Sequence, residues 1–388
     1  MNIIKRFYDE VFEPYKMIIQ DQFKIHDSFQ WVNNEWRERL DWNNIVNGPY
    51  LERAIIYEEW PEIDTLHLQQ KTIEILRSKI GAAKLYRHQY EVIQKIKESK
   101  STIIATGTNS GKTLSFQIPI INDLISDNSP GLRAIIIYPM NALANDQLEE
   151  WSLLLKNCPN ILFGIYTGET PQNHSVYEKN LEIKYEQKLR KNPEISEQSK
   201  ESEKRKLVCM EKERDQKEFP NKLLTREQIR KNPPHILITN FAMLEYILER
   251  PVDAPIFEKH RLKYLVMDEI HAYRGAQATE IAFLIRRLKD RLGISHIVCI
   301  ATSATLANKN DSSTRESIRK FASSLFMEEF EDFNPISEYE KKLNAPSSPI
   351  YFRPGDYVEL ANLLKENKEL MNVNINGKQV SLKELIEN

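Results

Sequence analysis

A short loop between an apolar run and an apolar helix constrains the fold more than any other feature. The run Thr102–Ala105 leads into residues 106–113, TGTNSGKT, and the apolar segment LSFQIPII follows directly. This order of strand, glycine-bearing loop and helix start is the context of a phosphate-binding loop. Backbone N–H groups of such a loop, together with the positive end of the helix, face phosphate oxygens. The sequence therefore predicts a nucleotide site.

Each residue of this loop has an expected part in holding the nucleotide. We expect Lys112 to reach the β- and γ-phosphates of ATP and the Thr113 hydroxyl to bind Mg²⁺. Thr106 replaces the first glycine of the strict motif, and Asn109 is a residue that tolerates positive φ. A chance Gly-Lys-Thr turn is the alternative, and the flanking strand and helix disfavour it. The predicted set is Thr106, Gly107, Thr108, Asn109, Ser110, Gly111, Lys112 and Thr113.

Short β-branched runs recur between residues 80 and 325, each followed by a polar turn and a helical stretch. Continuous apolar runs of this length predict strands that are buried on both faces of a parallel sheet. Right-handed crossovers then give an α/β fold with a doubly wound parallel sheet. The runs are Thr102–Ala105, Ala134–Tyr138, Ile161–Tyr166, Ile236–Thr239, Tyr264–Met267 and Ile297–Ala301.

Two carboxylates follow one of these runs directly. Asp268 and Glu269 come after Tyr264–Met267, and adjacent residues of an extended chain point to different sides. We expect Asp268 to bind the metal and Glu269 to orient and deprotonate the attacking water. Acidic residues that simply end a strand are the ordinary alternative. The position on a separate strand downstream of the phosphate loop favours the catalytic interpretation.

A third polar segment follows the last run. Ser303-Ala304-Thr305 comes shortly after Ile297–Ala301, and its hydroxyl groups are expected to bond to His271 and to sense the γ-phosphate. In isolation, a turn rich in serine and threonine would be the simpler interpretation. Three such signals in this order, each at the end of a predicted strand, favour a nucleotide-hydrolysing site.

At this point the chain resembles the superfamily 2 helicases of the DExH/DEAD-box type, and specifically their first RecA-like lobe. Asp268-Glu269-Ile270-His271 is similar to the DExH box, which makes His271 a fourth catalytic candidate beside Lys112, Asp268 and Glu269. Tyr86-Arg87-His88-Gln89 resembles the adenine-reading Q motif, with Gln89 as its glutamine. Ser303-Ala304-Thr305 resembles the motif that couples hydrolysis to movement.

The same resemblance implies a track for nucleic acid, with single-stranded DNA as the expected partner. Short side chains and N–H groups at strand ends position phosphates without reading sequence, so binding is expected to be sequence-independent and sensitive to salt. The residues that match these strand-contacting turns are Pro139, Asn141, Thr167, Gly168, Thr239 and Asn240.

A narrower likeness involves the segment DEIHAYRGAQATEIAFLIRRL. It resembles large bacterial helicases of DNA repair and anti-phage defence, which often end in a helicase-associated domain and imply partner subunits. A complete motor of this class needs a second RecA-like lobe, and nothing after Thr305 resembles one. We therefore expect that lobe on a continuation of the chain or on another polypeptide. A non-enzymatic ATP-binding scaffold subunit is the alternative.

The remaining regions are described by composition. Residues 1–79 are expected to be a mostly helical accessory region. Residues from about 171 to 230 are expected to be a charged helical insertion in the 80–325 lobe, and residues 326–388 a linker toward the second lobe.

The whole chain has 54 basic and 56 acidic residues and a net charge of −2, which neither favours nor excludes nucleic acid as a partner. Three scattered cysteines disfavour zinc and disulfides, and no apolar run approaches the ~18–20 residues of a membrane span. We expect a cytoplasmic protein.

Overall fold

The computed structural model describes residues 57–80, 84–107, 110–190, 197–303, 312–331, 335–337, 372–375 and 378–381. Its contacts divide the chain into two compact units, one of Tyr57–Glu340 and one of Met1–Ile56 with Lys341–Asn388. Within the second of these, the described residues form an antiparallel hairpin of β11 (Asn372–Ile375) and β12 (Lys378–Ser381). Most of the predicted helical region 1–79 lies outside the described residues.

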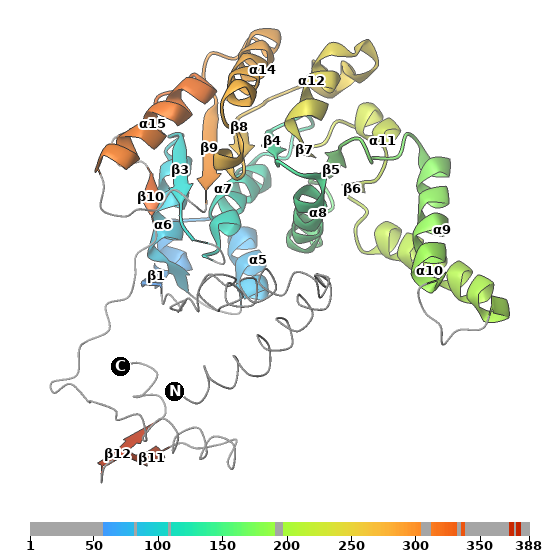
Figure 1. Ribbon diagram of the computed structural model, residues 1–388, viewed down its shortest axis with the longest axis horizontal. Helices are drawn as coiled ribbons and strands as arrows, with labels where there is room; N and C mark the ends of the chain where they lie inside the picture. Colours follow the sequence, from blue (N-terminus) through green and yellow to red (C-terminus); the bar gives the residue numbers. More distant parts are fainter. Residues whose placement is uncertain are drawn as a thin grey trace, which may run out of the picture. The chain divides into compact units, whose positions relative to one another are not determined.

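An eight-stranded sheet forms the centre of the larger unit (Figure 1). Its strand order is β10-β3-β9-β8-β4-β7-β5-β6, and every neighbouring pair is parallel. This confirms the predicted α/β fold with a doubly wound sheet. The strands are β3 (Thr102–Ala105), β4 (Ala134–Ile137), β5 (Phe163–Tyr166), β6 (Lys222–Leu223), β7 (Ile236–Thr239), β8 (Tyr264–Met267), β9 (Val298–Ser303) and β10 (Ile336–Ser337).

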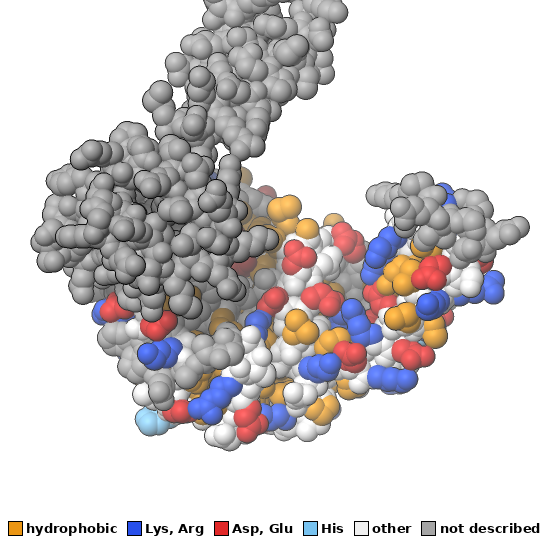
Figure 2. Space-filling model, turned by 90° about the horizontal axis from the view of Figure 1, so that it is seen from below, with side chains coloured by type: hydrophobic (Ala, Val, Ile, Leu, Met, Phe, Trp, Pro, Cys, Tyr) orange, Lys and Arg blue, Asp and Glu red, His pale blue; other side chains and the backbone are white. Residues whose placement is uncertain are grey.

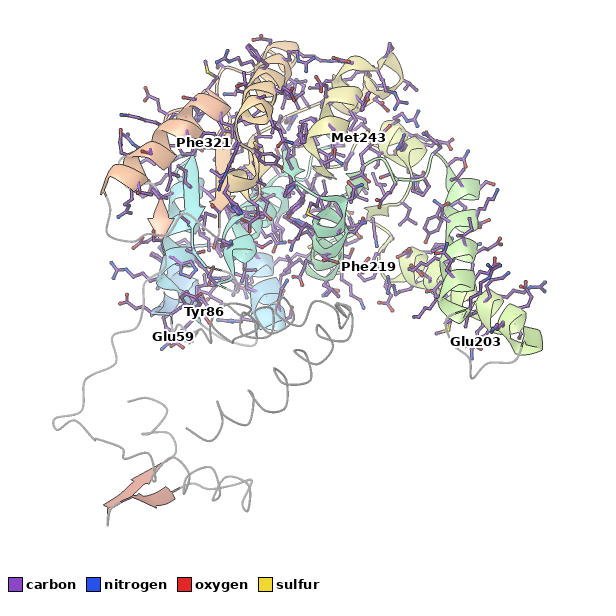
Figure 3. All side chains as sticks on the ribbon, viewed as in Figure 1. Glu59, Tyr86, Glu203, Phe219, Met243 and Phe321 are labelled. Atoms are coloured by element: carbon purple, nitrogen blue, oxygen red, sulfur yellow. The ribbon has the colours of Figure 1, made fainter. Side chains whose placement is uncertain are left out.

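Helices cover both faces of the sheet because each central strand is apolar on both sides. Ile104, Val266 and Ile300 pack against α6, α7 and α8, whereas their neighbours Leu265 and Cys299 pack against α12, α14 and α15. Figure 3 marks Met243 of α12 and Phe321 of α15, which pack on the second of these cores. The helices are α6 (Arg87–Lys97), α7 (Lys112–Ser126), α8 (Asn141–Leu155), α11 (Arg226–Lys231), α12 (Phe241–Glu249), α13 (Pro255–Glu258), α14 (Ala276–Leu292) and α15 (Ser312–Phe326).

The larger unit extends on both sides of the span 80–325 that the strand pattern predicts. Upstream, α5 (Gln70–Ile80) and the antiparallel pair β1 (Glu59–Glu62) and β2 (Lys84–Tyr86) precede α6. A third apolar cluster, which includes Leu76, Ile93 and Ile118, joins this layer to α6 and α7. Downstream, β10 adds an edge strand beside β3. Both additions bury apolar side chains against the lobe, which explains why they belong to it.

The charged insertion forms a helical hairpin, α9 (His174–Arg190) with α10 (Glu197–Lys217), here called the arm (Figure 1). Its base is anchored, since the hydroxyl of Tyr177 donates to Asp215 Oδ2 at 2.6 Å and both side chains are buried. Figure 2 shows acidic and basic side chains interspersed over the described surface in that view. In the part of the chain that the structure describes, no helix is both long and apolar enough to cross a bilayer.

A buried histidine makes the stability of the lobe depend on pH. His235 is 3% exposed, accepts from the Leu162 N–H through Nδ1 at 2.9 Å, and lies 3.2 Å from Asn128 O through Nε2. Burial lowers the pKa of His235 below its ordinary value of 6.5. The folded state therefore resists protonation more than the unfolded state does. The stability that neutral His235 gives the fold is complete above the pKa of the unfolded state. It is lost as the pH falls from that value toward the lower pKa of the folded state.

We expect the melting temperature of the wild type to decrease when the pH is lowered from about 7.5 to about 5.5. These two values lie on either side of the ordinary histidine pKa. His235→Asn retains an acceptor near the position of Nδ1 but does not titrate, so its melting temperature should fall less over the same interval. Circular dichroism melts of both proteins measure the difference. Equal pH dependence in the two would assign the effect to other groups.

Candidate functional site

The strand order brings the three predicted nucleotide-binding segments to one edge of the sheet. Strands β3, β9 and β8 are neighbours, and all run parallel. Their carboxyl ends lead into the phosphate loop, Ser303 and the pair Asp268-Glu269, respectively. Ligands of open α/β sheets bind outside the carboxyl ends of the strands. These segments, which lie up to about two hundred residues apart in sequence, therefore share a single site.

The phosphate loop is closed by a contact across its base. Thr106 Oγ1 lies 2.6 Å from Ser110 Oγ, and both residues are fully buried. The threonine that replaces the first motif glycine thus has a bonding partner within the loop. Gly111 caps α7 with φ 73°, a left-handed conformation that favours glycine. Gly107 is described and lies just after β3, whereas Thr108 and Asn109 lie outside the described residues.

Gln89 holds the loop from the side of α6. Its Oε1 accepts from the Tyr86 N–H at 3.0 Å, and its Nε2 donates to Gly111 O at 3.0 Å. The neighbouring His88 Nε2 lies 2.9 Å from Ser110 O. A Cβ at Gly111 would lie 2.3 Å from Gln89 Nε2, so a side chain there would displace the Gln89 amide from its position on the loop. The predicted Q-motif glutamine and the phosphate loop therefore form one packed unit.

Glu269 lies at the centre of a chain of polar contacts. Lys112 Nζ donates to Glu269 Oε1 at 3.3 Å, while Glu269 Oε2 lies 3.0 Å from His271 Nδ1. That same His271 nitrogen is 3.1 Å from Ser303 Oγ. Glu269 adopts φ 50° and ψ 52°, a conformation that costs energy for a residue with a side chain. The chain Lys112–Glu269–His271–Ser303 links the start of α7 to the end of β9.

Asp268 is fixed by the backbone and by a hydroxyl that the sequence reasoning did not select. Its N–H donates to Ile137 O at 3.0 Å, and the Thr302 hydroxyl donates to Asp268 Oδ1. Thr302 Oγ1 also accepts from the Glu269 N–H at 3.0 Å. Burial raises the pKa of the Asp268 carboxyl, and the Thr302 hydroxyl opposes that shift. The parallel register of β8 and β9 could have identified Thr302. Met267 pairs with Ala301, so the next residues, Asp268 and Thr302, also lie side by side.

The remaining site residues are consistent with a magnesium ion that is bound together with nucleotide. Thr113 lies in the first turn of α7, and Asp268 follows β8. A hydroxyl and a carboxylate are hard oxygen donors of the kind that Mg²⁺ prefers alongside phosphate oxygens and water. Among the described residues, no group of three or more His, Cys, Asp and Glu side chains forms a ready metal cage. Ala304 and Thr305 lie outside the described residues.

The predicted strand-contacting turns gather at the adjoining half of the same edge. Strands β4, β7 and β5 are neighbours, and their carboxyl ends lead to Asn141, Asn240 and Thr167. Asn240 Nδ2 donates to Asn141 Oδ1 at 2.8 Å, and Asn141 Nδ2 donates to Glu169 Oε1 at 3.0 Å. The amides of two turns and the carboxylate of the third therefore form one network.

A hydroxyl group aligns another member of this group with the neighbouring strand. The Thr239 hydroxyl donates to Tyr166 O at 2.7 Å, which ties the end of β7 to the end of β5. Gly168 is exposed, whereas Thr167 is buried, and Pro139 lies between β4 and α8. Glu169, which completes the network, lies in the predicted turn 167–170, but nothing in the sequence selects its side chain as a contact residue.

Several known proteins are similar to this chain in sequence. The DEAD/DEAH box helicase family model matches residues 86–313. The chain is 33% identical over 373 residues to Druantia protein DruE of Escherichia coli (strain UMEA 4076-1), which covers 77% of this chain and 20% of DruE. It is 30% identical over 244 residues to the ATP-dependent helicase YprA of Bacillus subtilis (strain 168), covering 62% of this chain and 25% of YprA.

A solved structure with a similar fold is that of the DUF1998 helicase MrfA bound to DNA. It superposes with a TM-score of 0.50 at 26% identity, covering 81% of this chain and 36% of MrfA. The chain thus spans about a fifth to a third of the length of these relatives. The family match covers more than half of the chain, includes both the phosphate loop and the Asp268–His271 box, and confirms the resemblance drawn from the motifs. The chain belongs to the DEAD/DEAH box helicase family.

Proposed function

We propose that residues 57–340 are the ATP-binding first lobe of a DNA helicase or translocase. The observation that supports this most directly is the polar chain from Lys112 through Glu269 and His271 to Ser303. It joins the residue expected at the phosphates, the expected base and the segment expected to couple hydrolysis to movement. A structural role alone does not require a strained glutamate between a lysine and a histidine.

Lys112 exchanges partners in the proposed mechanism. Before nucleotide binds, its ammonium group pairs with Glu269; with ATP bound, it turns to the β- and γ-phosphates. That exchange releases Oε1 of Glu269 to accept a proton from the attacking water. Mg²⁺, held near Thr113 and Asp268, would neutralise charge that develops on the phosphate oxygens. His271 holds the other carboxylate oxygen, so the base keeps its orientation while the lysine moves.

The network of Asn141, Glu169 and Asn240 is proposed to face the DNA backbone. Its donors are short and lie at strand ends, where they can position phosphates without reading bases. The DNA-bound state of MrfA supports DNA as the track for this chain. The resemblance to defence and repair helicases suggests those pathways and their partner subunits.

A second RecA-like lobe is proposed to complete the site. The chain covers 36% of MrfA and 20% of DruE, so most of each relative has no counterpart in this sequence. Arginines supplied from a partner domain raise phosphoryl-transfer rates by roughly 10³–10⁵ where a single arginine finger has been studied. We therefore expect slow turnover from this chain alone and faster turnover when the second lobe is supplied.

A non-enzymatic ATP-binding scaffold is the second candidate, and the anchored arm favours it as a surface for protein partners. The two candidates differ in cells. The helicase should lose its biological activity with Lys112→Ala, whereas retained activity would support the scaffold.

Asn240 provides a direct test of the proposed DNA track. Its Oδ1 accepts from the Met243 N–H at 2.7 Å and caps α12, and both serine and aspartate can retain this cap. Asn240→Asp places a negative charge where a phosphate is expected, so its affinity for fluorescein-labelled oligo(dT) should fall about tenfold or more. Asn240→Ser should lose much less. The penalty of the aspartate should shrink as salt is raised, because salt screens the repulsion.

Fluorescence anisotropy at several salt concentrations measures these affinities, with melting curves to confirm that each α12 cap is intact. Equal binding by Asn240→Asp and the wild type would place the DNA elsewhere. An oligonucleotide of mixed sequence should bind about as well as oligo(dT). A strong preference between them would contradict backbone-only recognition.

A further inference from the structure

A buried arginine holds the turn Thr167–Thr170 from the side opposite to solvent. Arg226, the first residue of α11, is 7% exposed and lies where the chain returns from the arm. Its Nη2 donates to Thr167 O at 2.8 Å and to Gly168 O at 3.0 Å. The guanidinium carbon lies 5.2 Å from the ring centre of Tyr166. One side chain thus bonds to two successive carbonyl groups of the turn.

These two bonds set the direction of the next two N–H groups. In a planar trans peptide the C=O and the N–H point in opposite directions. Because the carbonyls of Thr167 and Gly168 point to Arg226, the N–H groups of Gly168 and Glu169 point away from it. Both residues are exposed, and neither N–H donates to any described residue. Successive N–H groups directed at solvent form a concave anion-binding site.

The rest of the turn is fixed by hydroxyl and amide contacts. The Thr170 hydroxyl accepts from the Thr167 N–H at 2.9 Å and donates to Ile165 O at 2.9 Å. The Glu169 carboxylate accepts from Asn141 at 3.0 Å, so the acidic group is held by an amide. The Thr170 N–H also donates to Thr167 O at 3.3 Å, whereas Arg226 bonds to the carbonyls of both outward peptides.

Tyr166, whose ring packs against Arg226, is itself held in place. The Tyr166 hydroxyl donates to Asp253 Oδ1 at 2.5 Å, and Asp253 is fully buried with Arg230 and Arg250 within 3.6 Å and 3.4 Å of its oxygens. The Arg226 N–H donates to Pro171 O at 2.9 Å, which closes the base of the arm beside the turn. Arg226 is therefore held in place from both sides and cannot turn toward solvent without breaking this packing.

We propose that Arg226 is a positioning residue for the DNA backbone, and this rests on the proposed function. It presents the N–H groups of Gly168 and Glu169 to one phosphate without touching the nucleic acid. Helix α11, which follows the arm, thereby shapes the proposed DNA site without entering it. Without Arg226 these peptides could rotate. The phosphate would then lose its hydrogen bonds to both N–H groups.

The test compares Arg226→Gln, Arg226→Lys and the control Arg205→Gln, whose exposed arginine pairs with Glu201 on α10. Affinity for fluorescein-labelled oligo(dT) is measured by anisotropy over a range of salt concentrations. We expect Arg226→Gln to bind about tenfold more weakly, as for loss of a hydrogen bond to a charged group. Arg226→Lys retains a charged donor and should recover part of the affinity, and Arg205→Gln should match the wild type.

The salt dependence separates positioning from direct contact. Removing a cation that touches a phosphate lowers the slope of log affinity against log salt by about one. Arg226→Gln should keep the wild-type slope, because Arg226 does not touch the DNA. A slope lowered by about one, or an unchanged affinity, would overturn the proposal.

Folding is checked by circular dichroism. If Arg226→Gln does not fold, Thr170→Val tests the same turn without a change of charge, because it removes the acceptor of the Thr167 N–H. It should also weaken binding at an unchanged slope, and wild-type affinity in both Thr170→Val and Arg226→Lys would overturn the proposal. Failure of the wild type to bind oligo(dT) would overturn the proposed DNA function and this inference together. Equal binding by wild type and all variants would overturn the inference alone.

Discussion

Lys112→Ala should lower the affinity of this chain for ATP by about a hundredfold. Each hydrogen bond between a charged group and its partner contributes about 1.5–3 kcal/mol, and the ammonium group is expected to reach two phosphates. The substitution has a second effect. It removes the cation that lies 3.3 Å from Glu269 Oε1 and leaves that carboxylate beside Asp268. The unbalanced negative charge then repels the incoming phosphates.

Titration with a fluorescent ATP analogue measures this loss. Lys188→Ala is a matched control, because Lys188 is an exposed lysine of α9, on the arm rather than at the phosphate loop. The double variant Lys112→Ala/Glu269→Gln separates the two effects, since it removes the unbalanced carboxylate and should recover part of the affinity. Wild-type affinity in Lys112→Ala would show that nucleotide does not bind at this loop.

Glu269→Gln should reduce the rate of ATP hydrolysis by roughly 10²–10⁴ while ATP still binds, which is the range for loss of a general base. Glutamine has the same shape as glutamate and can still accept from Lys112 and adjoin His271. It cannot take a proton from water at neutral pH. Binding should therefore survive, and only the chemical step should slow.

Single-turnover phosphate release, with the protein in excess over ATP, measures that step with or without a second lobe. Asp268→Asn is the contrasting variant. If Asp268 binds the metal, its substitution should raise the Mg²⁺ concentration that is needed for tight ATP binding, whereas Glu269→Gln should not. Equal rates of hydrolysis in Glu269→Gln and the wild type would remove Glu269 from the role of base.

The parts of the fold that the sequence predicted are those with a local signal. Strands such as Ala134–Ile137 are continuous apolar runs and need both faces covered, whatever lies around them. Strands β6 and β10 were missed because each has two residues, too few for a periodic pattern. They exist because β5 and β3 offer an edge for pairing.

The candidate site likewise has residues with a local sequence signal and residues without one. The expected phosphate loop and the acidic pair have residue patterns that are tied to their chemistry, so the sequence alone could propose them. Thr302 and Arg226 were not, because their partners depend on strand register and on the return path of an insertion of about sixty residues. A buried arginine next to a charged helix looks like one more solvated charge until its carbonyl partners are known.

The continuous parallel ladder has a mechanical consequence. The two halves of the site meet at β8 and β4, where the Asp268 N–H still donates to Ile137 O, one step beyond the paired ends of both strands. A hydrogen-bonded sheet packed on both faces resists stretching between its strands. We therefore expect the proposed ATP site not to act on the proposed DNA site by separating these strands. If the lobe moves along DNA as proposed, we expect the movement to be a rotation of a second domain against this rigid sheet.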